Sequence, residues 1–170
     1  LGDVYKRQGY GNQKNELPVL LPILTRQQAN RALDLLDFKK YITKRKVRVS
    51  RLAFITYTGT PAVFVRFSGC NLKCSFCDTQ HEEGVWMSDE EILAEVGKYP
   101  AVTVILTGGE PSLWIDREFV DCLHWMGKYV CIETNGTHSL PDNIDWVTCS
   151  PKQGAKLCIS RMDEVKVVYE

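Results

Sequence analysis

The chain has 170 residues, of which 44% are hydrophobic, and its 21 basic and 21 acidic residues give a formal net charge of zero. This composition fits one globular domain with a sizeable core and argues against an intrinsically disordered chain. No apolar run reaches the roughly 18 residues that a membrane-spanning helix needs, so we expect a cytoplasmic protein without a membrane anchor.

The first 56 residues differ in charge from the rest of the chain. Residues 1–51 hold 12 basic and four acidic side chains, which leaves nine basic and 17 acidic ones for residues 52–170. Residues 39–51 contain seven basic residues and no acidic one. We interpret this run as a solvated or disordered arm rather than a nucleic-acid-binding site, because it lacks an aromatic platform. Residues 1–56 are therefore treated as an atypical basic segment with no assigned fold.

From residue 57 onward, short apolar runs alternate with helical patterns, which predicts strand and helix units around a parallel sheet. Ser88 and Glu91 form a capping box, which predicts a helix that ends before Pro100. The continuous apolar run at residues 102–106 predicts a strand that is buried on both faces. The other predicted elements are strands at residues 63–67, 129–132, 146–148 and 164–169 and a helix near residues 119–126. The fold class is therefore α/β.

Three of the seven cysteines lie in the sequence CNLKCSFC at residues 70–77, directly after the first of these strands. Close spacing in a cytosolic chain favours a metal or cluster site over disulfides. Cys70, Cys74 and Cys77 can ligate three irons of a 4Fe–4S cluster and leave the fourth iron without a protein ligand. His81 offers a fourth ligand for a zinc site instead, although this spacing fits no common zinc module.

The remaining cysteines and the histidines are not assigned to chemistry. Four cysteines lie among apolar neighbours, and we expect them to be buried and unreactive: Cys122, Cys131, Cys149 and Cys158. No histidine has a serine, cysteine or paired carboxylate arranged as a nucleophilic triad, so all three are expected to be non-catalytic.

Polar and glycine-rich turns follow the later strands, with TGGEP at residues 107–111, ETNGT at residues 133–137 and SPK at residues 150–152. Together with TPAVFVRFSGCNL at residues 60–72 and CDT at residues 77–79, they are similar to the 7-carboxy-7-deazaguanine synthase family of the radical S-adenosylmethionine (SAM) superfamily. The resemblance covers residues 57–170 and implies a partial TIM-like barrel of parallel strands with outer helices, the radical SAM core.

Two regions depart from the family pattern. Residues 52–59 read LAFITYTG and keep only the tail of the family's substrate-contacting segment, which indicates that residues 1–56 are not the native leader of the barrel. The family also continues beyond the fifth strand with further SAM and substrate contacts, so we expect a core that is truncated at the C-terminus.

The resemblance assigns roles to residues at successive strand ends. Cys70, Cys74 and Cys77 would hold the cluster, and Thr79 would bind Mg²⁺ through its hydroxyl oxygen. The residues implied to bind SAM are Phe76, Gly108, Gly109, Glu110, Ser150, Pro151 and Lys152. The residues implied to contact the substrate are Arg66, Thr107 and Glu133, with Arg66 paired to a substrate carboxylate. No catalytic residue is assigned beyond these contacts.

The implied reaction converts 6-carboxy-5,6,7,8-tetrahydropterin to 7-carboxy-7-deazaguanine, a lyase step of queuosine biosynthesis and the tRNA modification pathway. The implied cofactors are a 4Fe–4S cluster, SAM and Mg²⁺. The implied partners are the pterin, an electron donor such as flavodoxin or ferredoxin, and a second copy of the chain, with no direct nucleic acid and no membrane. Two alternatives stay open: a radical SAM activating enzyme that acts on a protein partner, and a non-enzymatic metal-binding fragment.

Overall fold

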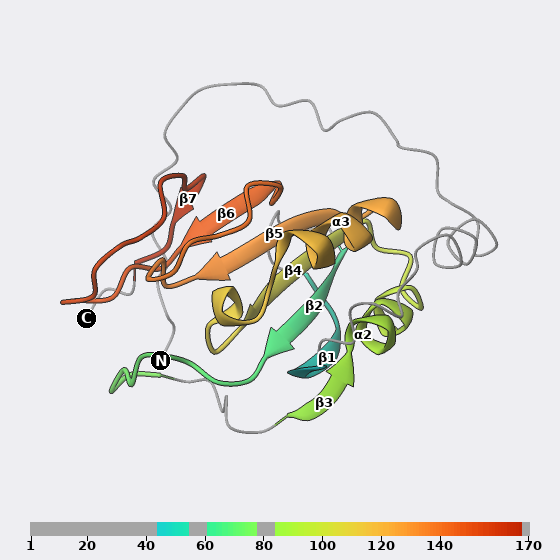
Figure 1. Ribbon diagram of the computed structural model, residues 1–170, viewed down its shortest axis with the longest axis horizontal. Helices are drawn as coiled ribbons and strands as arrows, with labels where there is room; N and C mark the ends of the chain where they lie inside the picture. Colours follow the sequence, from blue (N-terminus) through green and yellow to red (C-terminus); the bar gives the residue numbers. More distant parts are fainter. Residues whose placement is uncertain (1–43, 55–60, 78–83, 168–170) are drawn as a thin grey trace.

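The computed structural model describes residues 44–54, 61–77 and 84–167 and places their strands in one seven-stranded sheet (Figure 1). The strand order is β3-β1-β2-β4-β5-β6-β7. None of the described helices is long and apolar enough to cross a membrane.

Five parallel strands make up most of the sheet. They are β2 (Pro61–Phe67), β4 (Thr103–Gly108), β5 (Tyr129–Thr134), β6 (Trp146–Cys149) and β7 (Glu164–Val165). The five predicted strands are all present, and the predicted α/β class with a parallel, partial barrel-like sheet is confirmed. The last strand is shorter than the predicted 164–169, and residues 168–170 lie outside the described part of the chain.

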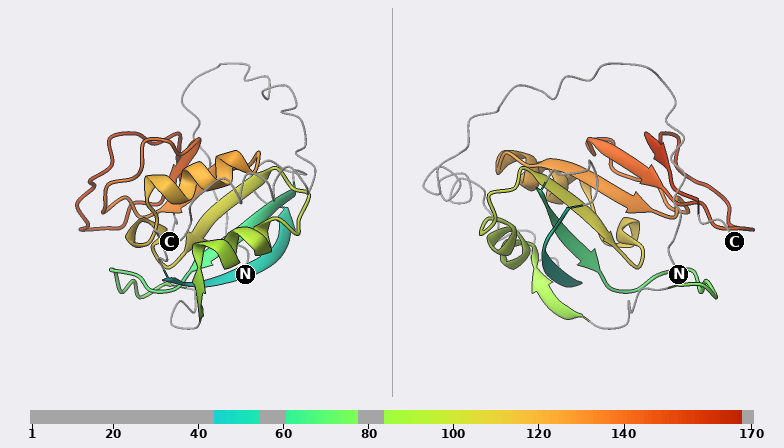
Figure 2. Two further views of the ribbon diagram at one scale, coloured as in Figure 1. Left: turned by 45° about the vertical axis from the view of Figure 1, so that its right-hand side comes forward. Right: turned by 180° about the vertical axis from the view of Figure 1, so that it is seen from behind.

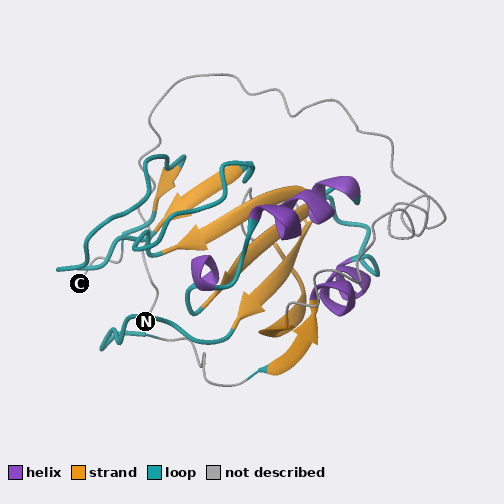
Figure 3. Ribbon diagram, viewed as in Figure 1, coloured by secondary structure: helices purple, strands orange, loops and turns teal. Residues whose placement is uncertain are grey.

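Two helices follow strands of this sheet, with α2 at Asp89–Val96 and α3 at Arg117–Trp125 (Figure 3). The predicted capping box of α2 is confirmed, because the Glu91 N–H donates to Ser88 Oγ at 3.2 Å and the Ser88 N–H donates to Glu91 Oε2 at 2.7 Å. In α3, Asp116 caps the first turn by accepting the Phe119 N–H at 2.9 Å. A short 3₁₀ turn, η2 (Pro111–Leu113), precedes α3.

Both helices pack on the same face of the sheet, where the main core lies (Figure 2). Alternate residues of the strands point to this face because successive strand side chains point to opposite sides. The core residues from the strands include Val63, Val65, Val104, Leu106 and Ile132, and the helices add Ile92, Leu93, Phe119 and Leu123. Complete burial of these side chains supplies the main driving force for the fold.

The opposite face of the sheet carries a smaller apolar cluster and, nearer the carboxyl ends of the strands, polar residues. Ala62, Phe64, Ile105 and Cys131 form the cluster, and no residue of the described helices belongs to it. The polar residues of this face belong to the candidate site.

Two antiparallel strands at one edge of the sheet are not predicted from the sequence. Strand β1 (Lys44–Phe54) pairs with β2 on one side and with β3 (Val85–Ser88) on the other. The interpretation of residues 39–51 as a solvated arm is therefore wrong for residues 44–51. Arg45 is only 1% exposed, because its guanidinium pairs with Asp89 and Asp116 at the starts of the two helices.

Candidate functional site

The cysteine loop begins where β2 ends and is held there by the turn after β4. The Gly109 N–H donates to the Phe67 carbonyl at 2.9 Å, and the Glu110 N–H donates to the Gly69 carbonyl at 2.9 Å. A Cβ atom on Gly109 would collide with the Gly69 oxygen, and one on Gly108 would collide with Phe67 backbone. Both glycines are thus required by packing of the chain's own backbone, in addition to any approach to a bound ligand.

Glu110 is fully buried and joins the cysteine loop to two strand ends. Its carboxylate accepts hydrogen bonds from the Ser112 N–H at 3.0 Å, the Thr134 hydroxyl at 2.6 Å and the Asn135 N–H at 2.7 Å. These three donors compensate the cost of burying the carboxylate. The structure gives Glu110 a structural role, and its contact with the SAM ammonium stays a prediction.

Beside Cys70 lies a set of side-chain hydrogen bonds that we call the amide network, formed by Asn71, Asn135 and Thr137. Asn135 Nδ2 donates to Asn71 Oδ1 at 3.1 Å, Asn71 Nδ2 donates to Thr137 Oγ1 at 2.8 Å, and the Thr137 hydroxyl donates to Asn135 Oδ1 at 2.7 Å. Two N–H groups approach Cys70 Sγ: the Leu72 backbone at 3.4 Å and Asn135 Nδ2 at 4.0 Å. The network therefore connects the loop to the end of β5.

The three loop cysteines differ in exposure. Cys70 and Cys74 are half-buried, whereas Cys77 is exposed and donates its backbone N–H to the Cys74 carbonyl at 3.2 Å. Burial raises the pKa of the Cys70 thiol, and the negative charges of Glu110 and the other two loop cysteines add to this, whereas the Leu72 N–H lowers it. The Cys70 thiol must lose its proton to become a metal ligand.

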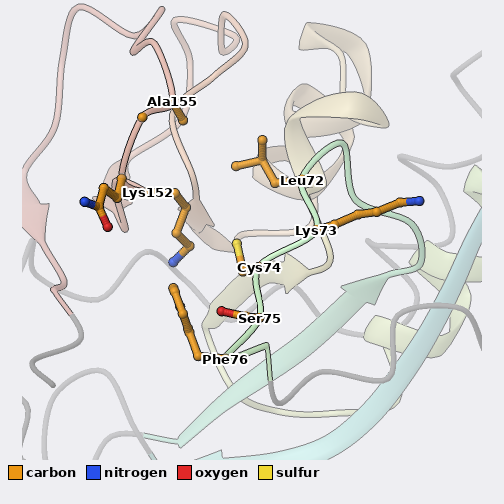
Figure 4. Close-up of a pocket in the computed structure, with 9 residues that line it drawn as sticks. Leu72, Lys73, Cys74, Ser75, Phe76, Lys152 and Ala155 are labelled. Atoms are coloured by element: carbon orange, nitrogen blue, oxygen red, sulfur yellow. The ribbon is translucent and has the colours of Figure 1, made fainter.

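An open pocket of about 390 Å³ lies between the cysteine loop and the loop that follows β6 (Figure 4). Residues 72–76 line one side and residues 152–155 the other. Lys152 Nζ lies 5.7 Å from the centre of the Phe76 ring and donates to Ser150 Oγ at 2.7 Å. The structure thus brings two residues of the predicted SAM set, Phe76 and Lys152, to the pocket that Cys74 also lines, and a third, Ser150, contacts Lys152.

Polar residues, one from each parallel strand, form a row across the face of the sheet opposite the two helices. This polar row consists of Arg66, Thr107, Glu133, Thr148 and Glu164. The Thr107 hydroxyl donates to Glu133 Oε2 at 2.9 Å, and the Thr148 hydroxyl donates to Glu164 Oε2 at 3.0 Å. The three residues predicted to contact substrate therefore lie side by side on neighbouring strands.

Two cations lie against side chains of this face. The Arg66 guanidinium lies 5.1 Å from the centre of the Phe64 ring, and Lys166 Nζ lies 3.7 Å from Glu133 Oε1. The row therefore offers both hydrogen-bond acceptors and positive charge to a polar, acidic ligand.

The other four cysteines only partly match the expectation of buried thiols. Cys131 and Cys149 are buried as expected, Cys122 is half-buried, and Cys158 is exposed, so the expectation is wrong for Cys158. Cys158 lies in the loop between β6 and β7, outside the described helices and strands, and its side chain is exposed. Burial raises the pKa of Cys122 to about 11 and that of Cys131 to about 12, which keeps both thiols protonated and unreactive at neutral pH.

The donor atoms of the cysteine loop fit a cluster with one open iron, since three thiols on one loop follow directly after a strand. Among the described residues, no three His, Cys, Asp or Glu side chains are gathered into a metal-binding group. The fit therefore rests on the donor atoms and on the position of the loop beside the pocket. Thr79 and His81 lie outside the described residues.

A comparison of the sequence with known protein families supports the predicted radical SAM core. Residues 64–148 match the Radical SAM superfamily, and this match spans half of the chain, so the chain belongs to that superfamily. Within it, the chain is 80% identical over 114 residues to 7-carboxy-7-deazaguanine synthase of Bacteroides thetaiotaomicron, covering 67% of this chain and 63% of that protein. It is 42% identical over 136 residues to the synthase of Nitratidesulfovibrio vulgaris, covering 65% and 63%.

A solved structure gives the same result. The crystal structure of QueE from Escherichia coli has a TM-score of 0.55 and 29% sequence identity, over 66% of this chain and 62% of that one. The predicted resemblance to the 7-carboxy-7-deazaguanine synthases is confirmed. The chain spans less than two thirds of the length of these relatives.

The sequence pattern does not single out Asn71, Thr148 or Glu164. Asn71 lies inside the cysteine loop and contacts residues more than 60 positions away, which no local pattern reveals. Thr148 and Glu164 could have been found by aligning the predicted parallel strands, because both fall on the strand face that carries Glu133.

Proposed function

We propose that this chain is a radical SAM enzyme that converts 6-carboxy-5,6,7,8-tetrahydropterin to 7-carboxy-7-deazaguanine. The observation that carries the proposal is the meeting of three segments at the carboxyl ends of the parallel strands. These segments are the cysteine loop, the turn after β4 and the loop after β6. Ligand sites of parallel α/β folds lie at this end of the sheet. The reaction is taken from the names of the relatives, which cover the same segments at up to 80% identity.

The cofactor half of the site is formed by the cysteine loop and the pocket beside it. Cys70, Cys74 and Cys77 would hold a 4Fe–4S cluster. When bound, the cluster and SAM would supply a one-electron reductive cleavage that generates a 5′-deoxyadenosyl radical. Phe76 offers an aromatic face to the adenine, and Lys152 lies across the pocket from it with a positive charge. Gly108, Gly109, Glu110, Ser150 and Pro151 complete the proposed SAM contacts.

The substrate half is the polar row. Arg66 pairs with the carboxylate of the pterin through its two-pronged guanidinium, and Glu133 accepts N–H groups of the ring. Thr107 orients the Glu133 carboxylate through their 2.9 Å hydrogen bond. These residues bind and orient the pterin so that its reacting carbon faces the cofactor pocket.

Further parts of the proposal rest on the family resemblance. They are Mg²⁺ bound through Thr79, an electron donor such as flavodoxin or ferredoxin, a homodimer and a cytoplasmic location. Residues 57–170 are proposed as the radical SAM core on the same ground, and β1 (Lys44–Phe54) adds an antiparallel strand to its sheet.

The test is anaerobic reconstitution of the 170-residue chain with iron and sulfide, followed by turnover with SAM, the pterin and dithionite. We expect iron–sulfur absorbance, 5′-deoxyadenosine and 7-carboxy-7-deazaguanine, the last two measured by mass spectrometry. Cys77→Ala removes one of three cluster ligands and should abolish all three signals. Cys158→Ala removes an exposed cysteine outside the loop and should leave them unchanged.

Two results would contradict the proposal. Absence of iron–sulfur absorbance in the reconstituted chain would remove the cluster assignment. Formation of 5′-deoxyadenosine without conversion of the pterin would remove the substrate assignment and favour the alternative of an activating enzyme with a protein partner.

A further inference from the structure

Asn135 occupies a position that links the cysteine loop to the end of β5. It is 6% exposed, and its backbone N–H donates to the buried carboxylate of Glu110 at 2.7 Å. The backbone is therefore anchored independently of the side chain. The side-chain amide points instead to the cysteine loop, where Nδ2 lies 3.1 Å from Asn71 Oδ1 and 4.0 Å from Cys70 Sγ.

The two atoms of this amide are oriented by Thr137. Asn135 Oδ1 accepts the Thr137 N–H at 3.0 Å and the Thr137 hydroxyl at 2.7 Å. Because a backbone N–H can only donate, the amide atom that faces the Thr137 N–H must be the oxygen. The NH₂ group of Asn135 must therefore face the cysteine loop. Asn71 closes the amide network by donating its own Nδ2 to Thr137 Oγ1 at 2.8 Å.

We propose that Asn135 is a positioning residue for the cluster: its amide holds Cys70 at the strand ends and donates an N–H to the sulfur. This inference rests on the proposed function, because it assigns Cys70 to a cluster. Hydrogen bonds to cluster sulfurs are among the factors that set the reduction potential, and they stabilise the more negative, reduced form. Outer partners that orient a metal ligand typically change metal affinity about 10–100-fold when they are removed.

The experiment compares two Asn135 variants with a matched asparagine. Asn135→Ala removes the amide, and Asn135→Asp keeps its shape and the acceptor for Thr137 but loses both N–H donors. Asn143→Ala is the control, because Asn143 also donates two hydrogen bonds, to Asp121 Oδ1 at 2.8 Å and to the Arg117 carbonyl at 3.1 Å, and neither involves the cysteine loop. The readouts are the rate of cluster loss to a chelator and the midpoint potential of the cluster, followed by electron paramagnetic resonance.

We expect both Asn135 variants to lose the cluster about tenfold faster and to have a more negative midpoint potential than the unmodified chain. Asn143→Ala should match the unmodified chain in both. Equal behaviour of the Asn135 and Asn143 variants would overturn the inference. Faster cluster loss with an unchanged potential would also overturn it, because Asn135 would then be only a folding contact.

A second measurement separates this inference from the proposed function. If the unmodified chain binds no cluster, the proposed function fails. In the cluster-free chain, amide hydrogen exchange of residues 70–74 then tests the positioning role alone. We expect faster exchange in Asn135→Ala than in Asn143→Ala, and equal exchange would show that the amide does not hold the loop.

Discussion

At the scale of single residues, the buried carboxylate of Glu110 connects the parts of the candidate site. Glu110 accepts three hydrogen bonds and donates its backbone N–H to the first turn of the cysteine loop. The sequence indicates only that a Gly-Gly-Glu-Pro turn ends a strand. Its partners Thr134 and Asn135 lie in a separate strand-end motif, and their contact with Glu110 depends on the pairing of β4 with β5.

Glu110→Gln should destabilise the fold, because the amide NH₂ cannot accept the hydrogen bond of one of the three donors. Leaving a buried donor unsatisfied costs about 1–3 kcal/mol. The free energy of unfolding in urea measures this loss. Glu118→Gln makes the same chemical change at an exposed position in the first turn of α3, where we expect less than about 1 kcal/mol. A similar loss in both variants would contradict the structural role of Glu110.

At the scale of elements, the sequence predicts those parts whose pattern is local. The capping box of α2 and the apolar runs of β2, β4 and β5 are complete within a few residues, and each is confirmed. Strand β1 is not predicted, because its many basic residues suggest solvent exposure. The buried position of Arg45 depends on Asp89 and Asp116, which lie 44 and 71 residues away.

Arg45 attaches the antiparallel edge of the sheet to both helices. Its guanidinium donates to Asp89 at 2.5 and 2.9 Å and to Asp116 at 2.8 Å, and it lies 4.7 Å from the Phe119 ring centre. Arg45→Met leaves the largely buried Asp89 carboxylate without its cation, so we expect a loss of about 3 kcal/mol in the free energy of unfolding.

The control for this prediction is a salt bridge on the surface. Lys98, whose side chain is 65% exposed, pairs with Glu95 within α2 and its following turn. Lys98→Met should cost less than about 1 kcal/mol, because water and salt screen an exposed pair. Urea unfolding of both variants gives the comparison, and a loss at Arg45 no larger than that at Lys98 would refute the attachment role.

At the scale of the whole molecule, the sheet divides the protein into a packed side and a polar side. The helix-covered face holds the core, and the other face carries the polar row. The sequence predicts that glycines and polar side chains follow the buried strands, but it does not assign the two faces of the sheet, and it predicts burial on both faces for the run at residues 102–106. It does not predict the amide network or the second Thr–Glu pair, which require the register between strands.

The buried cysteines should make the whole fold sensitive to alkaline pH. Burial raises the pKa of Cys122 to about 11 and that of Cys131 to about 12, from 9.0. Between pH 9 and 11 the unfolded chain therefore loses thiol protons that the folded chain keeps. The free energy of unfolding is then highest below pH 9 and falls as pH rises toward 11.

This prediction is measured by urea unfolding at several pH values in the presence of a reductant. Cys131→Ala should give a shallower decline between pH 9 and 11, because one of the thiols that cause it is gone. Cys158→Ala, which removes an exposed thiol, should keep the slope of the unmodified chain. An unchanged slope in Cys131→Ala would mean that other groups cause the decline.

The contacts of Glu110 also determine the order in which the site can form. Glu110 bonds to Gly69 at the start of the cysteine loop and to Thr134 and Asn135, which follow Glu110 by 24 and 25 positions and lie at the end of β5. The loop is therefore held in place only after three strands have come together, and such non-local contacts form late because loop closure costs entropy. Small zinc modules, in contrast, fold only when metal binds. In this protein we expect folding to come first and iron to be loaded into a sheet that is already assembled.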